Sequence, residues 1–258
     1  MPDFTNIIYT EENSISWIQL NRPEKLNAFT KDMWEEFYET VELAKNSKTG
    51  VVVVSGVGRA FSAGDDIKAT YELKNKEEAD NFFNTLLKVF ESLLEIEKPM
   101  IGMVNGLAYG GGFEILLLMD VVIATKESKF ALSEAKLGLI PPAALSFGYT
   151  ILGIKQINRL SLIGEAIDVY EAQRIGLVDC IAEKDDLRNK TLEIAWKIIS
   201  NATHSVQFIK KWSNTHKDKS KFIELINVLT MFSLDSNARK RMEDFVTKRK
   251  ENEIVIFC

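Results

Sequence analysis

Two glutamates, each beside a glycine-rich or apolar stretch, are the residues of this sequence best suited to acid and base chemistry. Glu114 follows three consecutive glycines in NGLAYGGGFEILLLMD, and Glu134 lies twenty residues further on in KFALSEAKLGLIPP. Paired carboxyl groups in partly apolar surroundings carry out proton transfer at neutral pH in many proteins. We therefore interpret Glu114 and Glu134 as candidate catalytic residues flanking one cleft. The plainer alternative makes Glu134 a surface residue near a helix start.

The glycines before Glu114 predict a backbone site for a negatively charged oxygen. We expect a strand at residues 100–104, a turn at 105–110 and a short helix at 111–118. The first N–H groups of a helix have no partner within it, and the aligned peptide dipoles there favour negative charge. Because glycine lacks Cβ, a ligand carbonyl can approach this backbone closely. A purely structural role stays open, in which the glycines only let the helix cross the strand closely.

A second glycine-bearing loop offers a second backbone donor. The stretch SGVGRAFSAGDDIK, residues 55–68, follows an apolar run at 51–54 that we expect to be a buried strand. It matches neither the phosphate-binding loop GxxxxGK[ST] nor the dinucleotide fingerprint GxGxxG. Alone it is an ordinary strand-to-helix connection, but two such loops together can direct two N–H groups at one ligand oxygen.

Short apolar runs alternate with helical patterns up to residue 186, which predicts an α/β fold. Strands are expected at residues 15–20, 51–55, 100–104, 121–125, 130–132 and 178–182. Amphipathic helices are expected at 29–44 and 77–94. From residue 187 the strand patterns stop, and helices are expected at 187–200, 205–212, 222–234 and 239–250. This tail therefore forms a helical layer rather than a second α/β unit.

Taken together, the motifs resemble the enoyl-CoA hydratase/isomerase family, also called the crotonase superfamily. The resemblance is carried by NRPEKLNA, RAFSAGDDIK, NGLAYGGGFE, SEAKLGLIP and EAQRIGLVD, and it extends over nearly the whole chain. It implies a crotonase-like spiral of repeated ββα units over residues 1–186, with a C-terminal helical region at 187–258. It also implies an acyl-CoA substrate, no metal or other cofactor, and a homotrimer or dimer of trimers.

The resemblance further implies roles for particular residues. The backbone N–H groups of Asp65 and Gly111 would bind the thioester oxygen. Glu114 would orient and deprotonate the water that attacks C3, and Glu134 would give a proton to C2. Residues expected along the CoA moiety are Arg22, Lys25, Leu26, Ala28, Ala63, Asp66, Ile67, Lys68 and Gly110, and those expected in the acyl pocket are Phe113 and Leu145.

The three cationic residues expected along the CoA moiety have an alternative interpretation. Arg22, Lys25 and Lys68 are candidates for neutralising the phosphates of CoA, as point charges or as a guanidinium fork. Each of them taken singly is more simply a solvated surface cation.

The sequence departs from the family's pattern at two places. After the second glutamate, hydratases of the family usually continue with a proline and a glycine-rich turn, whereas this chain has PPAALSFG from Pro141 to Gly148. We expect a turn here as well, and its larger side chains leave the accepted acyl-chain length open. Asp65 is the other departure, because an ionised side chain pointing inward would oppose negative charge on the thioester oxygen. We therefore expect the Asp65 side chain to point outward.

Within the family, an enoyl-CoA isomerase that moves a double bond from C3 to C2 is the nearest alternative. By family analogy it needs one glutamate as a proton shuttle. The presence of both Glu114 and Glu134 favours a hydratase, which adds water reversibly to a short- or medium-chain 2-enoyl-CoA. Thioester hydrolysis and decarboxylation also occur on this fold, so the family by itself does not define the reaction.

Charge and histidine content argue against other classes of protein. A net charge of −5 and a pI near 5.3 lack the basic footprint of nucleic-acid binding. The basic stretch KKWSNTHKDKSK, residues 210–221, is expected to be a solvated turn between two helices. His204 and His216 lie in the helical tail with no nucleophile elbow or spaced cysteines nearby, which disfavours a Ser-His-Asp hydrolase and a metal centre.

Neither a membrane span nor an exported protein is expected. The apolar stretch 99–125 contains Asn105, Glu114 and Asp120, which are too polar for the interior of a bilayer. The first residues, MPDFTNIIYTEENS, carry acids where a signal peptide carries basic residues, and Cys180 and Cys258 are too few and too far apart for a disulfide framework. We expect a cytoplasmic protein.

Overall fold

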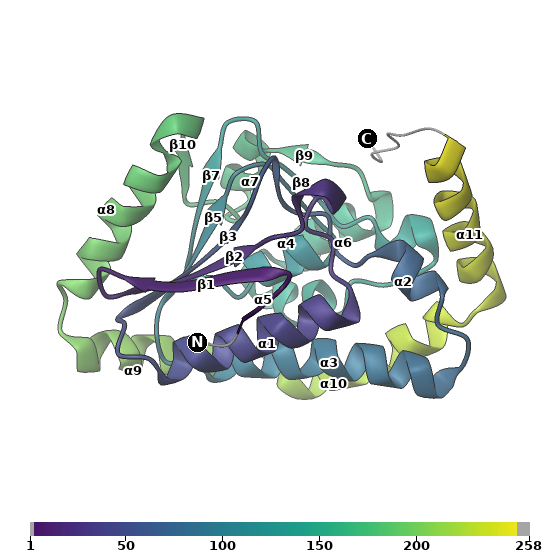
Figure 1. The fold of residues 1–258 in the computed structure, drawn as a ribbon, viewed down its shortest axis with the longest axis horizontal. Helices are drawn as coiled ribbons and strands as arrows, with labels where there is room; N and C mark the ends of the chain where they lie inside the picture. The colour runs from purple at the N-terminus through teal and green to yellow at the C-terminus, as the bar shows by residue number, and fades with distance from the viewer. Residues whose placement is uncertain (1–2, 252–258) are drawn as a thin grey trace.

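The computed structural model describes residues 3–251, which form a larger and a smaller β-sheet surrounded by helices (Figure 1). The strands are β1 (Ile7–Glu12), β2 (Ile15–Leu20), β3 (Val51–Gly56), β4 (Ala60–Ser62), β5 (Met100–Val104), β6 (Leu107–Tyr109), β7 (Val121–Thr125), β8 (Lys129–Ala131), β9 (Ile167–Asp168) and β10 (Cys180–Ala182). The α-helices are α1 (Lys31–Asn46), α2 (Ile67–Tyr71), α3 (Lys76–Glu95), α4 (Gly111–Leu116), α5 (Tyr149–Ile151), α6 (Ile154–Ile163), α7 (Val169–Arg174), α8 (Leu187–Ile199), α9 (Thr203–Asn214), α10 (Lys219–Ser233) and α11 (Ser236–Glu251). Single helical turns of other types are η1 (Pro23–Lys25), η2 (Glu134–Leu137), η3 (Ala144–Gly148) and η4 (Lys184–Asp186).

The two sheets are built up in parallel by successive turns of a spiral. The larger sheet has the order β1-β2-β3-β5-β7-β10, in which β1 and β2 are antiparallel and the other pairs are parallel. The smaller sheet has the order β4-β6-β8-β9 and is parallel except for β8 with β9. The first turn, before α1, has both of its strands, β1 and β2, in the larger sheet. The turns β3-β4-α2 and β5-β6-α4 pass from a strand of the larger sheet to one of the smaller sheet and then to a helix. The predicted α/β spiral of ββα units is confirmed.

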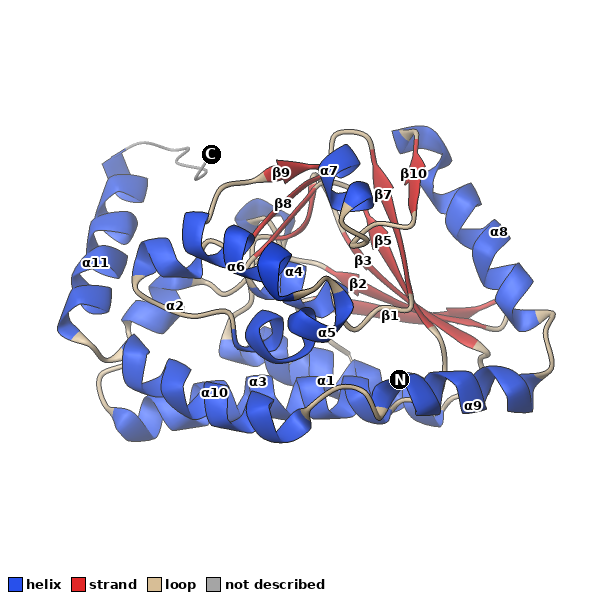
Figure 2. Cartoon of the chain, turned by 180° about the vertical axis from the view of Figure 1, so that it is seen from behind, coloured by secondary structure: helices blue, strands red, loops and turns tan. Residues whose placement is uncertain are grey.

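The larger sheet is covered on both faces, which explains its unbroken apolar runs. Val52 and Val54 of β3 face the main hydrophobic core, whereas Val51 and Val53 face a second core on the opposite side. Successive side chains of a strand point to opposite faces, so a strand buried on both sides needs apolar residues at every position. Helix α8 covers the second core, while α4, α5 and α6 gather on the other side of the sheet (Figure 2).

The helices α1, α3, α9 and α10 form a layer below the sheets in the view of Figure 1. The N-terminus of α1 is capped by the Thr30 hydroxyl, which accepts a hydrogen bond from the Met33 N–H at 3.3 Å. Helix α3 is capped in the same way by Asn75. Such caps satisfy N–H groups that the helix cannot pair internally. Helix α10 lies against α3, where the rings of Phe222 and Phe90 are 5.0 Å apart.

Several expected elements differ from those observed. The expected turn at 105–110 contains the short strand β6, and β1, β4 and β9 have no counterpart among the expected strands. The PPAALSFG stretch is not a turn, because residues 142–151 are helical and Ala144–Gly148 forms a π-helical turn. The division of the chain at residues 186 and 187 stays a prediction. Residues 252–258, with Cys258, lie outside the described residues.

The basic stretch at 210–221 is only in part the solvated turn between two helices that was expected. Residues 215–218 form this turn, whereas residues 210–214 continue α9 and residues 219–221 open α10. Lys210 is 2% exposed, and its Nζ lies 2.8 Å from Oδ2 of Asp120. A buried ammonium group requires such a partner because burial of an unpaired charge is costly. Lys210 therefore ties α9 to the loop before β7 rather than facing a ligand.

Candidate active site

Glu114 lies in the first turn of α4, directly after the glycine triplet, and only 3% of it is exposed. Its Oε1 accepts a hydrogen bond from the main-chain N–H of Ala144 at 2.9 Å. Burial raises the pKa of the Glu114 carboxyl well above its usual value, and the charge of Glu134 raises it further, while the Ala144 hydrogen bond acts in the opposite direction. The residue is therefore an acid held in the interior, not a solvated helix-start glutamate.

Glu134 opens η2 directly after β8, and its carboxyl is enclosed by protein. Both of its carboxyl oxygens are buried, and neither has a hydrogen-bond partner among the described residues. Burial raises the pKa of this carboxyl above its usual value. Buried polar atoms are nearly always paired, so two unpaired oxygens on one side chain mark a group kept for a purpose other than folding. The alternative of a surface glutamate is wrong.

The two glutamates meet beside the glycine turn. A Cβ built on Gly110 would lie 3.2 Å from Oε1 of Glu134, and the Glu114 N–H donates to the carbonyl of Gly110 at 3.0 Å. The influence of Glu134 on the pKa of Glu114 shows that the two carboxyls act on one another electrostatically. The structure thus places on one side of a single glycine turn the two acids that the sequence separates by twenty residues.

The two glycine-bearing loops also converge. A Cβ on Gly64 would lie 2.9 Å from the backbone nitrogen of Gly111 and 2.8 Å from the carbonyl oxygen of Tyr109. Glycine is required at position 64 both for this approach and for its φ of +84°. Within the described residues, the N–H groups of Asp65 and Gly111 donate to no protein acceptor. Two free main-chain donors therefore lie on adjacent backbone segments.

The Asp65 side chain does not point outward, so that expectation is wrong. Its Oδ1 accepts a hydrogen bond from Nε1 of Trp34 at 2.8 Å. Burial raises the pKa of this carboxyl to about 6, with the Trp34 hydrogen bond acting in the opposite direction. The charge of Asp65 in turn raises the pKa of both Glu114 and Glu134. The inward orientation is possible because the indole N–H satisfies the carboxylate in place of water.

The two segments expected along the CoA moiety lie side by side. The Ala63 N–H donates to the carbonyl of Leu26 at 2.9 Å, and the Phe29 N–H donates to the carbonyl of Gly64 at 2.8 Å. Ala28 is buried and Ile67 is partly exposed. The CoA-binding roles of these residues stay predictions, but the fold does bring their two segments together.

The charged residues expected along the CoA moiety have different surroundings. Nη1 of Arg22 donates to the carbonyl of Ala28 at 2.8 Å and to Oδ2 of Asp66 at 3.0 Å. Asp66 also caps α2 through the Lys68 N–H. Lys25 and Lys68 are exposed, and Nζ of Lys68 lies 3.6 Å from a carboxyl oxygen of Glu72. Arg22 is therefore engaged in joining the two segments, while the lysines remain directed to the surface.

The residues expected in the acyl pocket belong to the hydrophobic core around Glu114. Phe113 is fully buried in the main core, and Leu145 packs partly buried against it. Leu145 lies in the π-helical turn η3, whose first residue, Ala144, contacts Glu114. Single π-helical turns occur often at functional sites. The assignment of Phe113 and Leu145 to an acyl pocket stays a prediction.

Helix α11 holds the elements that carry Glu134 and the second loop. Arg239 donates to the carbonyl oxygens of Leu73 at 2.6 Å and of Tyr71 at 2.8 Å, which fixes α11 against the end of α2. A Cβ on Gly138, at the end of η2, would lie 2.9 Å from Ala238 of the same helix. The C-terminal helix therefore packs closely against the end of η2.

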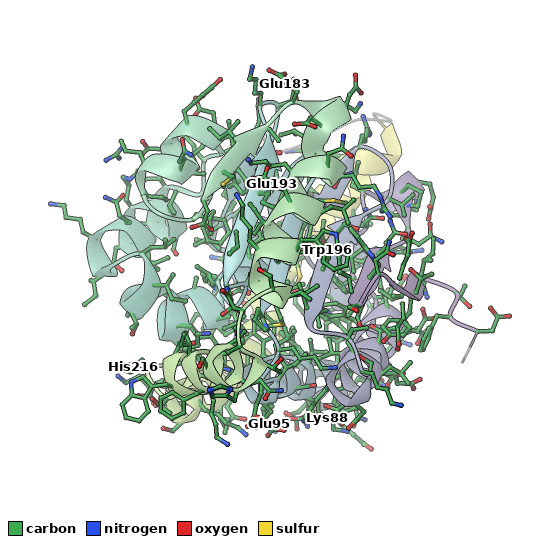
Figure 3. The ribbon with its side chains drawn as sticks, turned by 90° about the vertical axis from the view of Figure 1, so that its left-hand side faces the viewer. Lys88, Glu95, Glu183, Glu193, Trp196 and His216 are labelled. Atoms are coloured by element: carbon green, nitrogen blue, oxygen red, sulfur yellow. The ribbon has the colours of Figure 1, made fainter. Side chains whose placement is uncertain are left out.

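The structure gives no support to the other classes of site. His204 and His216 are exposed, and His216 lies on the outer surface at the end of α9 (Figure 3). No group of histidine, cysteine and acidic side chains suited to a metal ion occurs among the described residues. In the same part of the chain, no helix has the length and apolar character that crossing a membrane requires.

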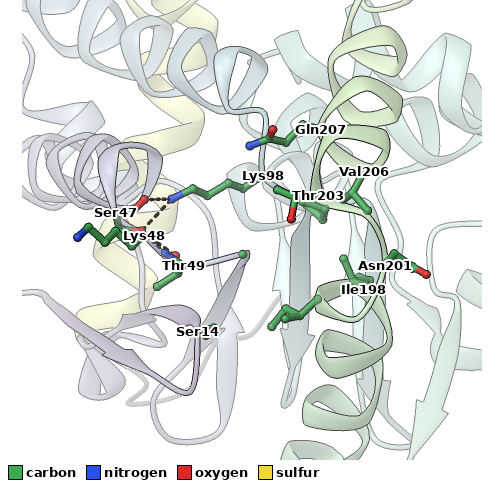
Figure 4. Close-up of a pocket in the computed structure, with 13 residues that line it drawn as sticks. Ser14, Ser47, Lys48, Thr49, Lys98, Ile198, Asn201, Thr203, Val206 and Gln207 are labelled. Carbon is green, nitrogen blue, oxygen red and sulfur yellow. Dashed lines mark hydrogen bonds between the residues drawn. The ribbon is translucent and has the colours of Figure 1, made fainter.

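A cavity of about 350 Å³ lies away from the glutamates, between the end of α1 and the helices α8 and α9 (Figure 4). Lys98 extends along it, but its Nζ donates to the carbonyls of Ala44 at 2.6 Å and Ser47 at 2.7 Å and to the Ser47 hydroxyl at 2.8 Å. A cation near the last carbonyls of a helix is stabilising there. Lys98 therefore caps α1, and the cavity contains none of the predicted site residues.

Two features of the site were not found from the sequence. Trp34, in the first turn of α1, carries the indole that binds Asp65, and its partner lies 31 positions further along the chain. The Ala144 N–H that binds Glu114 is 30 positions from it. A tryptophan within an amphipathic helix is ordinarily a core residue, and a backbone donor leaves no trace in a sequence. Neither had a local signal by which it would be recognised.

Comparisons with known proteins agree with this architecture. The family model described as enoyl-CoA hydratase/isomerase matches residues 10–252. The chain is 36% identical over 219 residues to the short-chain-enoyl-CoA hydratase of Clostridium acetobutylicum, covering 82% of each chain. It is 32% identical over 247 residues to the mitochondrial enoyl-CoA hydratase of Pongo abelii, covering 94% of this chain and 84% of that one.

Solved structures show the same fold. An enoyl-CoA hydratase/isomerase from Mycobacterium paratuberculosis superposes with a TM-score of 0.87 at 21% identity, covering 94% of this chain and 100% of that chain. Spiral sheets, convergent glycine loops and two buried glutamates thus occur in a chain whose sequence matches one family over nearly its whole length. The protein belongs to the enoyl-CoA hydratase/isomerase family.

Proposed function

We propose that the protein is an enoyl-CoA hydratase that adds water reversibly across the double bond of a short- or medium-chain 2-enoyl-CoA thioester. The observation that carries the proposal is the meeting of two buried, interacting glutamates, Glu114 and Glu134, beside the glycine turn. Hydration of an alkene needs one group to take a proton from water and another to give a proton to carbon. A site with two acids of raised pKa suits both tasks.

In the proposed reaction the thioester oxygen accepts hydrogen bonds from the N–H groups of Asp65 and Gly111. Attack of water at C3 places negative charge on that oxygen, giving an enolate. Donors already in position stabilise the enolate more than the uncharged thioester, which lowers the barrier. The convergence of Gly64 on Gly111 supports this assignment, because it places the two donating segments in contact.

The hydrogen bonds of the two carboxyls support a division of roles between them. Glu114 accepts a hydrogen bond from the Ala144 N–H, which stabilises an ionised carboxyl. Glu134 has no such donor among the described residues, so burial favours its protonated form. In our proposal, Glu114 orients and deprotonates the water, and Glu134 gives its proton to C2. The reverse sequence of steps is dehydration.

Relatives support the substrate class. The Clostridium acetobutylicum relative is named for short-chain enoyl-CoA, and the family model carries the name of the same reaction. We extend this to the present chain as an acyl-CoA substrate with a short or medium enoyl group. In this proposal the side chains of Leu145 and Phe113 line the pocket for the acyl group. The bulk of the π-helical turn at Leu145 limits the length of the acyl chain.

A panel of thioesters tests the function. The loss of double-bond absorbance is followed with crotonyl-CoA and with longer 2-enoyl-CoA, and isomerisation is followed with 3-enoyl-CoA. We expect hydration of crotonyl-CoA to be the fastest reaction and to fall with chain length. Faster conversion of 3-enoyl thioesters than hydration of any 2-enoyl thioester would replace the hydratase with the isomerase, which by family analogy needs one glutamate.

The remaining predictions about the protein are proposals as well. The reaction as written needs no metal or redox cofactor. Assembly as a homotrimer or dimer of trimers is supported by the large apolar side chains of Phe208, Trp212 and Met231, which are 60–68% exposed in the single chain. Light scattering on the purified protein tests this assembly. A cytoplasmic location is tested by fractionation, since the Pongo abelii relative is named as mitochondrial.

A further inference from the structure

Trp34 connects the two backbone segments whose N–H groups face the proposed thioester site. Its Nε1 donates a 2.8 Å hydrogen bond to Oδ1 of Asp65, the residue that carries one of the two N–H groups. On the other side, a Cβ built on Gly111 would lie 3.4 Å from Cζ2 and 3.7 Å from Cη2 of Trp34. One rigid indole thus bonds to one donor segment and lies beside the other, with room for no more than a methyl group between the ring and Gly111.

The indole is itself held in place by its neighbours. Trp34 is fully buried, and its ring stacks on Phe29 with centroids 3.7 Å apart and planes 11° from parallel. The main chain of Phe29 is bonded to the same loop, because its N–H donates to Gly64 and its carbonyl accepts from Asp66, each at 2.8 Å. A fully buried aromatic side chain has few accessible rotamers, so it can serve as a fixed spacer.

The charges around Asp65 explain why its side chain needs an anchor. The acidic groups that act on it are Asp66 on the same loop, Glu114 from α4 and Glu134 from η2. Arg22 is paired with Asp66 instead. The Trp34 N–H is the hydrogen-bond donor to the Asp65 carboxyl in the described chain. Without it, the Asp65 carboxyl would lose the donor that offsets its burial beside other acidic groups, and the side chain, with the backbone that carries it, would shift toward solvent.

We propose that Trp34 is a positioning residue for the reaction, which acts through Asp65 and Gly111 by holding their two N–H groups at the spacing that binds the thioester oxygen. The inference rests on the proposed use of those N–H groups. It assigns to the first turn of α1 a part in catalysis although Trp34 itself contacts no reacting atom. Small misplacement of positioned groups lowers rates strongly, so the indole affects turnover more than binding of the CoA moiety.

The first test replaces Trp34 by phenylalanine, which keeps an aromatic ring but removes the N–H. We expect Trp34→Phe to lower kcat for hydration of crotonyl-CoA about 10-fold, less than the ~100-fold typical of losing a whole oxyanion donor, with KM changed less than about 3-fold. Trp17→Phe is the matched control, because Trp17 is equally buried but lies in β2 on the second core. It should retain wild-type kcat. Unchanged kcat in Trp34→Phe would overturn the proposal.

A second measurement reports on the alignment of the two N–H groups and does not depend on the hydration reaction. Acetoacetyl-CoA is a β-keto thioester that forms an absorbing enolate, and a site with two aligned donors should increase the enolate fraction of the bound thioester. We expect this increase in the wild type and in Trp17→Phe, and its loss in Trp34→Phe and in Asp65→Ala. Asp65→Ala also carries the test if Trp34→Phe does not fold. An undiminished enolate fraction in both site variants would contradict the inference.

The double variant separates positioning through Asp65 from an independent effect. Adding Trp34→Phe to Asp65→Ala should lower kcat by no more than about 2-fold further, because the hydrogen bond is already absent. Losses that multiply would show that the two residues act separately. A wild type that increases the enolate but does not hydrate crotonyl-CoA refutes the proposed function and leaves this inference intact, whereas a wild type that does neither refutes both.

Discussion

The main-chain N–H of Ala144 donates a 2.9 Å hydrogen bond to Oε1 of Glu114. Ala144 belongs to a π-helical turn, in which the backbone departs from the regular i to i−4 hydrogen-bond pattern. Glu134, the other acid of the site, has both carboxyl oxygens buried with no partner among the described residues. Two glutamates of the same chemical type therefore occupy unlike surroundings: burial raises the pKa of both, but only Glu114 accepts a main-chain hydrogen bond that opposes this rise by stabilising the ionised carboxyl.

Replacing Glu114 by glutamine tests its role as the base. The amide oxygen can still accept from Ala144, but the side chain can no longer take a proton from water. We expect kcat for hydration of crotonyl-CoA to fall about 100- to 10,000-fold, the range typical of a lost general base. Isomerisation of 3-enoyl-CoA, where it is detectable, should largely survive. Glu224→Gln, at an exposed position of α10, serves as the control and should have wild-type activity. Hydration within 10-fold of wild type would remove Glu114 from the mechanism.

Replacing Glu134 by glutamine should alter the pH dependence of stability. Burial raises the pKa of Glu134 in the folded protein, whereas in the unfolded chain it is about 4.3. At a pH between the pKa of Glu134 in the unfolded chain and its higher pKa in the folded protein, the folded state binds more protons than the unfolded state. The free energy of unfolding therefore falls as the pH rises. The glutamine lacks this effect. Relative to the wild type, Glu134→Gln should gain roughly 1–3 kcal/mol of stability between pH 5 and pH 8.

Urea unfolding at the two pH values measures this difference. Glu224→Gln again provides the comparison and should show no such trend. If Glu134→Gln and the wild type respond to pH in parallel, the carboxyl of Glu134 is not held protonated by burial.

Gly110→Ala should impair both stability and activity. Gly110 has φ +51°, and a methyl group there would lie 3.2 Å from Oε1 of Glu134, so the carboxyl would have to move. The backbone strain should cost about 1–3 kcal/mol, and displacement of Glu134 should lower kcat about 10-fold or more. Gly153→Ala is the matched variant, because Gly153 has φ +86° but nothing within 4 Å of the added methyl. It should lose stability alone; equal kcat in the two variants would show that Glu134 tolerates the shift.

Arg22→Ala should act mainly on folding. The guanidinium joins the carbonyl of Ala28 to the carboxylate of Asp66, and both charged side chains are less than 20% exposed. Its removal leaves two partly buried acceptors short of a donor, at a cost of about 1–3 kcal/mol in the free energy of unfolding. Lys25→Ala, an exposed neighbour, should change that quantity by less than about 0.5 kcal/mol. Denaturant titration compares the two, and similar values would assign Arg22 to the surface.

Three strands of the larger sheet were predicted with their observed bounds because their burial leaves a local pattern. The expected strands at 15–20, 100–104 and 121–125 have the observed bounds. Strands covered on two faces are apolar at most positions, and this is visible in a single sequence. The short strand β6 has three residues and no such pattern, so it was interpreted as a turn. PPAALSFG was also interpreted as a turn, although it is helical and the N–H of its Ala144 is bound by the distant Glu114.

The sequence by itself determined the class of fold, the family, and the two acids and two loops that chemistry would use. These follow from residue types and short-range spacing, which apolar burial and the lack of a Cβ constrain locally. Only the tertiary structure decided which glutamate carboxyl is hydrogen-bonded, that the Asp65 side chain turns inward, and that the Trp34 indole donates a hydrogen bond to it. Those outcomes depend on donors some thirty positions away in the chain, whose approach is determined by packing of the whole core and not by any neighbouring residue.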